Sequence, residues 1–198
     1  ISAYLSANAS ITGEIVANES CYEIITMPNG AYALAHADAV AQIGGKSYYS
    51  LEEAYYYAVD GDEIVILNDI DLLMQVVIQK EITINLNGNN ISLPDVSGYA
   101  IIAEKPLTVD GEGIVIINGL YGLGVADNGE GSLTIKNGAY AGINESGKTS
   151  LFGGPNVSVS GGLFTHAVSE EYWANGYFVI PAESGEYYYT VTVEDYRL

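Results

Sequence analysis

Short runs of alternating apolar and small polar residues recur along the chain from residue 63 onward, and most of them end in Asn-Gly, Asp-Gly or Gly-Gly. The clearest copies begin at Ile82, Leu107, Leu133 and Val157, so successive starts lie 25, 26 and 24 residues apart. Alternation with a period of two is typical of β-strands, and a near-constant spacing of this length is typical of stacked coils. The pattern therefore predicts an all-β fold, a right-handed parallel β-helix formed as a single-stranded solenoid. Strands are expected at 63–67, 75–78, 82–86, 114–117 and 133–135.

Asparagine and glycine separate these runs and fit the corners of the coils, because both residues tolerate positive φ. Aligned asparagine side chains would then stack into a hydrogen-bonded ladder. The alternative is an antiparallel sandwich, in which the same pairs would be two-residue hairpin turns. A sandwich predicts a turn about every 8 to 12 residues and no longer period, so the recurrence favours the solenoid. The predicted corners are Asn87-Gly88, Asn118-Gly119, Asn128-Gly129 and Asn137-Gly138.

A helical pattern occupies residues 51–59. Ser50 and Glu53 have the spacing of a capping box, in which the serine oxygen accepts from the third amide and the glutamate reaches back to the cap. We expect the helix to stop near Gly61 and to cover the apolar end of the first coil, as the terminal caps of solenoids do. The apolar face comprises Leu51, Ala54, Tyr55, Ala58 and Val59, which recur at helical spacing.

The chain is expected to hold two parts. Residues 39–198 form the β-helix module with its capping helix at about 51–59, and residues 1–38 form the tail of a preceding module or an N-terminal β extension. Two sequence echoes favour the first interpretation of the tail, because 168–175 resembles 1–8 and 183–190 resembles 19–26. The chain begins at Ile1 without an initiator Met, so we expect it to be a piece of a longer tandem array.

Several segments carry a resemblance to a known family. They are 41–54, 58–67 and 82–91, followed by Ser160–Phe164 and Asn175–Tyr177. Together they resemble the β-helix modules of large secreted and surface proteins from gut-dwelling, mainly Gram-positive, bacteria, over about residues 39–193. The resemblance implies a pectate-lyase-like right-handed β-helix, export, and a role as a stalk or adhesin-like module. The family is largely uncharacterised, so the resemblance implies no catalytic residues, and this chain departs from its pattern in having many tyrosines.

Charge limits the partners. The chain has 25 acidic and 6 basic residues, a net charge of −19, which repels nucleic acid, anionic lipid and, without a bridging cation, acidic polysaccharide. The single cysteine, Cys21, has no partner for an internal disulfide, and no apolar run approaches the ~18 residues of a membrane span. We expect a monomeric module of a tandem array, secreted or displayed on the cell surface.

Enzymes such as pectate lyases and polygalacturonases also use the right-handed β-helix fold, so an enzymatic function is the alternative to weigh. A uronate lyase needs Arg or Lys beside calcium carboxylates, and the single arginine is Arg197 at the C-terminus. A glycoside hydrolase needs acids that converge within about 5 to 9.5 Å, and the best candidates are Asp95, Asp110 and Asp127 in successive turns. Solvated turn acids explain those three equally well, so we expect no catalytic residues. A polysaccharide-active enzyme, hydrolase or lyase, is the alternative.

Metal ligands are sparse. Asp60-Gly61-Asp62 and Asp69-Ile70-Asp71 offer oxygen ligands, but neither has the spacing of a calcium loop, and helix termination and strand-edge solvation account for both. His36 and His166 are isolated from other zinc ligands. We expect no metal and no cofactor.

Tyrosine is the feature that suggests binding. There are 17 tyrosines, including the triplets at 55–57 and 187–189, where neighbouring rings must point in different directions. Exposed rings stack on sugars and anchor protein interfaces, whereas the alternative is partial burial with a solvated hydroxyl. The expected function is a non-catalytic structural or adhesive module that binds a host or dietary glycan or a protein. The candidate ligand contacts are Tyr56, Tyr121, Trp173 and Tyr177.

Overall fold

The computed structural model describes residues 22–26, 32–36, 39–142, 150–181 and 189–193. The chain divides into two compact units, Ile1–Asp38 and Ala39–Leu198. In the first unit, β1 (Tyr22–Thr26) and β2 (Tyr32–His36) pair antiparallel over five residues each. Cys21, Arg197 and most of the sequence echo at the N-terminus lie outside the described residues.

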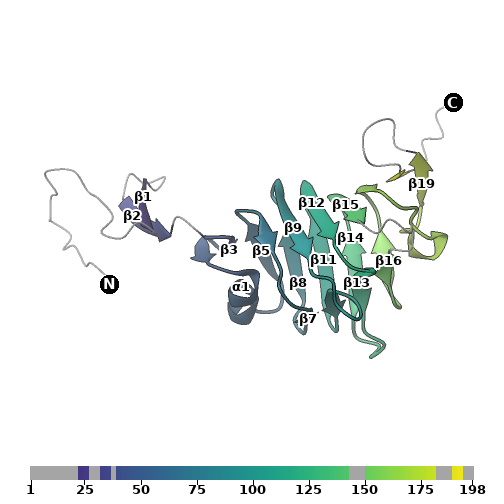
Figure 1. Ribbon diagram of the computed structural model, residues 1–198, viewed down its shortest axis with the longest axis horizontal. Coiled ribbons are helices and arrows are strands. Elements are labelled where there is room, and N and C mark those ends of the chain that lie inside the picture. Colours follow the sequence, from purple (N-terminus) through teal and green to yellow (C-terminus); the bar gives the residue numbers. More distant parts are fainter. Residues whose placement is uncertain (1–21, 27–31, 37–38, 143–149, 182–188, 194–198) are drawn as a thin grey trace, which may run out of the picture. The chain divides into compact units, whose positions relative to one another are not determined.

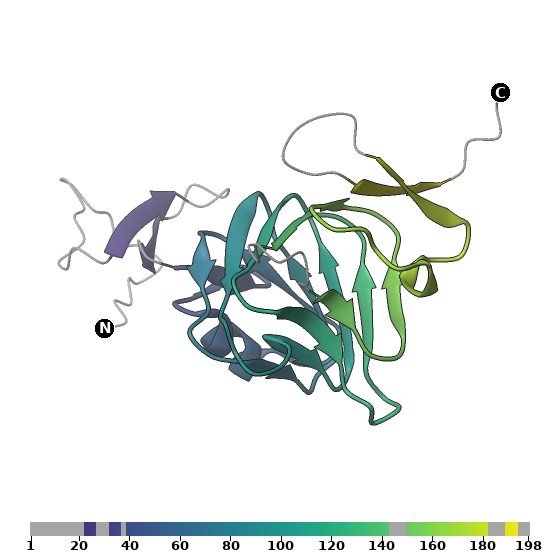
Figure 2. The ribbon, with the colours of Figure 1, turned by 45° about the vertical axis from the view of Figure 1, so that its right-hand side comes forward.

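The second unit is a parallel β-solenoid of about four turns, and its coils stack one behind another (Figure 1 and Figure 2). Each coil contributes one strand to each of three sheets. The first sheet stacks β5 (Asp62–Ile66), β8 (Ile82–Asn85), β11 (Pro106–Asp110), β14 (Ser132–Ile135) and β17 (Val157–Val159). The second stacks β6 (Ile70–Asp71), β9 (Asn89–Leu93), β12 (Gly113–Ile117), β15 (Ala139–Gly142) and β18 (Leu163–Phe164). The third stacks β7 (Val76–Ile78), β10 (Ile101–Ala103), β13 (Tyr121–Val125) and β16 (Ser150–Gly153).

The register confirms the sequence repeat. Ile82 pairs with Leu107, Leu107 with Leu133 and Leu133 with Val157, so the four predicted repeat starts occupy one position on successive coils. Because these strands run parallel, the antiparallel sandwich is excluded. The predicted all-β fold, a parallel β-helix with a short N-terminal capping helix, is confirmed.

The three sheets differ in how evenly their strands are spaced along the chain. Register partners in the first sheet are 25, 26 and 24 residues apart. In the second sheet, the series Asn90, Ile114, Ala139, Leu163 gives 24, 25 and 24. In the third, the series Val76, Ile101, Leu123, Phe152 gives 25, 22 and 29. Differences in coil length are therefore taken up at the corners that flank the third sheet.

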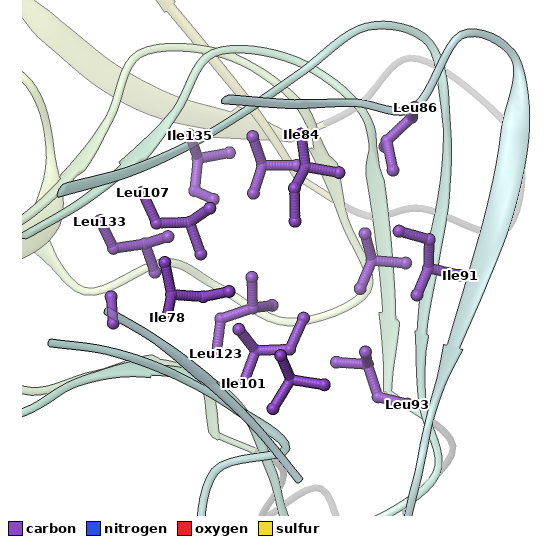
Figure 3. Packing of buried hydrophobic residues seen from close by; sticks show 14 of the residues in the cluster. Ile78, Ile84, Leu86, Ile91, Leu93, Ile101, Leu107, Leu123, Leu133 and Ile135 are labelled. Atoms are coloured by element: carbon purple, nitrogen blue, oxygen red, sulfur yellow. The ribbon is translucent and has the colours of Figure 1, made fainter. Parts of the chain in front are cut away.

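The core fills the inside of the coils with stacked aliphatic side chains. Ile84, Val109, Ile135 and Val159 share one register position and are all buried. Figure 3 shows Ile84 and Ile135 pointing into the same interior as side chains from the other two sheets. Burial of each such side chain stabilises the fold by about 1.5–3 kcal/mol. Inward-facing aliphatic side chains alternate along each strand and recur about every 25 residues along the chain. Each therefore stacks on a similar side chain in the coil before and in the coil after.

The last coils replace this aliphatic core with aromatic rings. The fully buried ring of Tyr140 stacks on Phe164, with centroids 5.3 Å apart, and meets the edge of Phe152 at 5.2 Å. Its hydroxyl donates a hydrogen bond of 3.0 Å to the carbonyl oxygen of Asn137. Burial raises the pKa of Tyr140 far above its ordinary value, so the phenol stays neutral in the core.

All four predicted Asn-Gly corners lie between strands. Instead of forming the predicted ladder with one another, three of their asparagines bond the backbone of the preceding coil. Asn87 Nδ2 donates to the Ile66 carbonyl oxygen at 3.0 Å, and Asn118 Nδ2 to that of Leu93 at 2.9 Å. Asn128 does the same to Glu104 at 3.1 Å. These three corners therefore fasten their coils to the ones before them, whereas Asn137 Oδ1 accepts from the adjacent Gly138 amide at 2.9 Å.

The N-terminal cap is larger than predicted. Helix α1 (Leu51–Tyr57) begins where expected, and the Ser50 hydroxyl accepts from the Glu53 amide at 3.0 Å. Glu53 Oε2 accepts from the Tyr49 amide at 2.9 Å, one residue before the predicted cap position. The hairpin of β3 (Ala41–Ile43) and β4 (Lys46–Tyr48), which the sequence pattern did not predict, completes the cap because β3 pairs antiparallel with β5.

The predicted helix end is wrong. Helix α1 ends at Tyr57, Ala58 adopts an extended conformation, and Val59 is 65% exposed. Val59 therefore does not belong to the buried face, and Gly61 is not the helix stop. The reason lies in contacts from elsewhere in the chain. Asp62 Oδ2 accepts from the Val59 amide at 2.8 Å, and Lys80 binds the last carbonyl groups of the helix.

Lys80 joins the helix to the first coil. Its Nζ donates to the carbonyl oxygens of Tyr55, Tyr56 and Ala58 at 2.9, 2.9 and 2.8 Å. It also lies 5.0 Å from the centroid of the Tyr55 ring. A cation is favourable at a helix C-terminus, where carbonyl groups lack partners within the helix.

Replacement of Lys80 by methionine is expected to lower the free energy of unfolding by about 1.5–3 kcal/mol, because three charge-assisted hydrogen bonds are lost at once. The matched control is Lys136→Met, since Lys136 is exposed on the last described coils and the change is otherwise identical. Urea denaturation measures both variants, and amide exchange over 51–57 locates the effect. Equal losses of stability in the two variants would contradict the assigned role.

The C-terminal end departs from the solenoid pattern. The 3₁₀ turn η1 (Glu170–Tyr172) follows the last coil. Strand β20 (Tyr189–Val193) then pairs antiparallel with β18 on one side and with β19 (Tyr177–Pro181) on the other. Thus the stack of parallel strands in the second sheet ends in an antiparallel pair.

Candidate binding surface

The four candidate contact residues lie at different levels of the second unit. Tyr56 is 75% exposed on α1, and Tyr121 is 40% exposed at the start of β13. Trp173 and Tyr177 are half-buried and pack against the core after the last coil. Trp173 also donates through Nε1 to the carbonyl oxygen of Val168 at 3.0 Å. The structure does not bring the four together.

The three rings of the tyrosine triplet at 55–57 point in different directions, as expected for neighbouring residues of a helix. Tyr55 turns towards the first coil, where its hydroxyl oxygen accepts from the Gln79 amide at 2.6 Å. Tyr56 and Tyr57 are exposed, with ring centroids 5.1 Å apart. Tyr57 stacks on Tyr48, and Lys46 Nζ lies 4.6 Å from the Tyr57 centroid. The prediction that at least one ring of this triplet is exposed is confirmed, while the triplet at 187–189 lies mostly outside the described residues.

A stripe of large side chains follows one corner of the solenoid. Met74, Tyr99 and Tyr121 each lie two residues before register partners of the third sheet, so they occupy the same position on three successive coils. The rings of Tyr99 and Tyr121 are in contact, with centroids 5.4 Å apart and planes at 62°. Met74 is 64% exposed. We call these three residues the tyrosine stripe.

Two glycines hold Tyr99 in place. Gly124 and Gly153 are register partners on β13 and β16, and a Cβ atom at either position would overlap the Tyr99 side chain. The ring therefore lies against bare backbone and covers both glycines. Burial is the main cause of a raised pKa of Tyr99, and the neighbouring phenols of Tyr172 and Tyr121 add to it. Sequence reasoning missed Tyr99, although the glycines at outward-facing strand positions were a visible signal.

A cavity of about 220 Å³ lies beyond the C-terminal end of the stripe. Ser150, the register partner of Tyr121, is part of its lining. Tyr172, which contributes to the raised pKa of Tyr99, is another lining residue. The cavity is therefore a neighbour of the stripe, next to Tyr121, and is lined in part by residues that follow the last coil.

The candidate catalytic acids are not brought together. Asp95 follows β9, Asp110 ends β11 and Asp127 follows β13, which places them at the three different corners of the coil. Asp110 Oδ1 accepts from the Gly111 amide at 2.7 Å, as a turn residue does. This arrangement supplies no pair of facing carboxylates from these three residues.

Two of the candidate metal ligands accept hydrogen bonds from backbone amides 21 residues further along the chain, on the next coil. Asp60 Oδ1 accepts from the Glu81 amide at 2.9 Å, and Asp69 Oδ1 accepts from the Asn90 amide at 2.8 Å. His166 Nδ1 shares a hydrogen bond of 2.9 Å with the Thr165 hydroxyl. Within the described part of the chain, no group of three or more His, Cys, Asp or Glu side chains is arranged to hold a metal ion.

The fold and this surface define a parallel β-solenoid with an exposed aromatic stripe. Comparison of the chain with family models, with curated proteins and with solved structures gave no match. Among the described residues, no helix has the length and apolar character that crossing a membrane requires.

Proposed function

We propose that this chain is a non-catalytic adhesive module of a secreted or cell-surface bacterial protein, and that its tyrosine stripe binds glycan. The solenoid is the rigid support in this proposal, and tandem copies would extend it. The resemblance to β-helix modules of surface proteins and the acidic composition agree with an extracellular setting.

The observation that carries the proposal is the contact pair Tyr99–Tyr121. Its two rings form a fixed surface because Tyr99 lies against Gly124 and Gly153, and because the strands beneath are bonded in register. Fixed aromatic rings lose little side-chain entropy on binding and stack well on the apolar faces of sugars. The neighbouring side chains Leu73 and Leu120 are also exposed, which makes the corner more apolar than an ordinary protein surface.

A non-catalytic role is favoured by the placement of acids. Asp95, Asp110 and Asp127 occupy separate corners, whereas hydrolysis needs two carboxyl groups within about 10 Å of each other across one bond. A ligand bound at the stripe would meet phenols and a thioether, which hold a sugar but do not break its glycosidic bond.

Replacement of Tyr121 by alanine is expected to weaken glycan binding by about tenfold or more, since a central aromatic contact is removed. The control is Tyr56→Ala, which removes an even more exposed ring from helix α1, away from the stripe, and should leave binding unchanged. A glycan array on the complete chain first selects the ligand, and calorimetry then measures the variants. Unchanged binding in Tyr121→Ala would contradict the proposal, as would release of reducing ends from the bound glycan. If no glycan on the array binds and the chain instead captures a protein through the stripe, the stripe is a protein-binding surface.

A further inference from the structure

We propose that the cavity next to the tyrosine stripe is a subsite for one uncharged pyranose residue. This inference rests on the proposed glycan binding and adds to it a second, distinct contact. The stripe would hold the neighbouring part of the same glycan.

The size of the cavity suits a single sugar ring. Its volume is about 220 Å³. Pockets that enclose drug-sized ligands are larger, at roughly 300–1,000 Å³. A monosaccharide therefore fits this space, and an oligosaccharide has to continue outside it, in the direction of the stripe.

The lining has the two-sided character of a pyranose. Leu151, Phe152 and Val168 line the cavity but are almost fully buried, so they contribute only a small apolar area beside the polar groups. The ring of Tyr172 adds an aromatic surface of the kind that stacks on the C–H face of a sugar. A purely apolar lining would favour a lipid or an aromatic ligand, and a purely polar one would hold only water.

The polar groups of the lining act both as donors and as acceptors. They are the hydroxyls of Ser150, Ser169 and Tyr172 and the imidazole of His166. The hydroxyls of a sugar need partners of this dual kind. Because Thr165 occupies Nδ1 of His166, the other ring nitrogen is the one that is available to a ligand.

Separate hydrogen bonds hold the parts of the lining in position. Trp173 Nε1 bonds the carbonyl oxygen of Val168 at 3.0 Å, and Ala174 bonds β17 through the carbonyl oxygen of Val159 at 2.9 Å. The Tyr172 amide donates to the carbonyl oxygen of Ser169 at 3.0 Å, which closes the turn η1. Trp173 thus acts as a positioning residue for this cavity.

The charge around the cavity favours a neutral sugar. Lys and Arg are missing from the described residues that line it. Glu170 and Glu171 are exposed beside Tyr172, and after burial Glu171 is the second cause of a raised pKa of the Tyr172 phenol. The same negative field repels a uronate or a sialic acid.

The test is a titration of the complete chain with single sugars, followed by NMR of the backbone amides. The probes are glucose, galactose, mannose and N-acetylglucosamine, with glucuronate, galacturonate and mannuronate as charged counterparts of the first three. Two variants fill the cavity, Ser169→Trp and Ala167→Trp, because both exposed side chains line it and neither makes a hydrogen bond that η1 requires. The control Ser47→Trp places the same ring on the exposed side of β4.

We expect at least one neutral sugar to shift the amides of 166–172, with a dissociation constant in the millimolar range. Both cavity variants should weaken this binding by roughly tenfold or more, whereas Ser47→Trp should not, and the matching uronate should bind roughly tenfold more weakly. Silence with all four neutral sugars would overturn the inference, as would unchanged binding in both cavity variants, or a uronate that binds as tightly as its neutral counterpart. Tyr121→Ala distinguishes the two proposals, because it should weaken glycan binding and leave the single-sugar titration unchanged.

Discussion

Replacement of Tyr140 by alanine is expected to lower the free energy of unfolding by about 3–5 kcal/mol, the range typical of a large buried ring replaced by a methyl group. Tyr140 stacks on Phe164 and meets Phe152, so its removal opens a cavity in the aromatic end of the core. The surrounding strands are held in register by the coil before them, which limits how far they can move inward to fill the space.

The control for this change is Tyr140→Phe. It keeps the ring contacts and loses only the hydrogen bond to the Asn137 carbonyl oxygen, at a cost of about 1 kcal/mol. Chemical denaturation of the two variants separates the packing contribution from that of the hydrogen bond. Losses of similar size in both variants would show that the hydroxyl, and not the ring, dominates at this position.

Replacement of Gly154 by alanine should cost about 2–5 kcal/mol for two physical reasons. Gly154 has φ of +95°, where an alanine is strained by about 1–2 kcal/mol. A Cβ atom here would also overlap the carbonyl oxygen of Val125 on the coil before, and lie 3.1 Å from the Val125 nitrogen. Because both obstacles are backbone atoms, the coils must separate locally, which adds about 1–3 kcal/mol.

Gly61 provides a matched control with φ of +90° and no atom within 4 Å of the position of an added Cβ. Gly61→Ala should therefore cost only the strain of about 1–2 kcal/mol. The difference between the two midpoints of thermal or urea denaturation measures the close approach between coils. If Gly61→Ala is as destabilising as Gly154→Ala, backbone strain alone accounts for both glycines.

The sequence predicted the repeat that sets the register of the first sheet, and placed the strands that it named to within one residue at each end. The reason is geometric. A strand whose inner face is apolar cannot slip by one position without turning that face to water. When the same short pattern returns every 24 to 26 residues, the four starts at Ile82, Leu107, Leu133 and Val157 have one register that buries all of them. The capping helix was likewise predictable at its start, where Ser50 and Glu53 act within a few residues of each other.

The features that escaped prediction depend on contacts between coils. The last carbonyl groups of helix α1 bind Lys80, and the sequence between 51 and 61 contains no sign of this contact. The end of the helix at Tyr57 was therefore not predictable from its own residues. The Tyr99–Tyr121 contact joins two coils at a corner of variable length, where no constant spacing marks the partner. Trp173 was selected for its ring alone, while its hydrogen bond and packing give it a part in holding the end of the solenoid. The ligand and the cellular location stay predictions.

The uneven spacing of the third sheet has a practical consequence. Register partners in the third sheet lie 22 to 29 residues apart, whereas those in the other two sheets keep a spacing of 24 to 26 from β8 and β9 onward. The corner between β9 and β10 can therefore gain or lose residues without changing the strand pairing. Loop closure entropy rises only slowly with length, by about 0.6 kcal/mol for each doubling. A foreign peptide inserted between Val96 and Gly98 would break the hydrogen bond from the Gly98 amide to the Val96 carbonyl oxygen but leave the paired strands of the three sheets in place. The same freedom would let the proposed glycan-binding surface vary at this corner by exchange of a few residues, separately from the residues that make the chain fold.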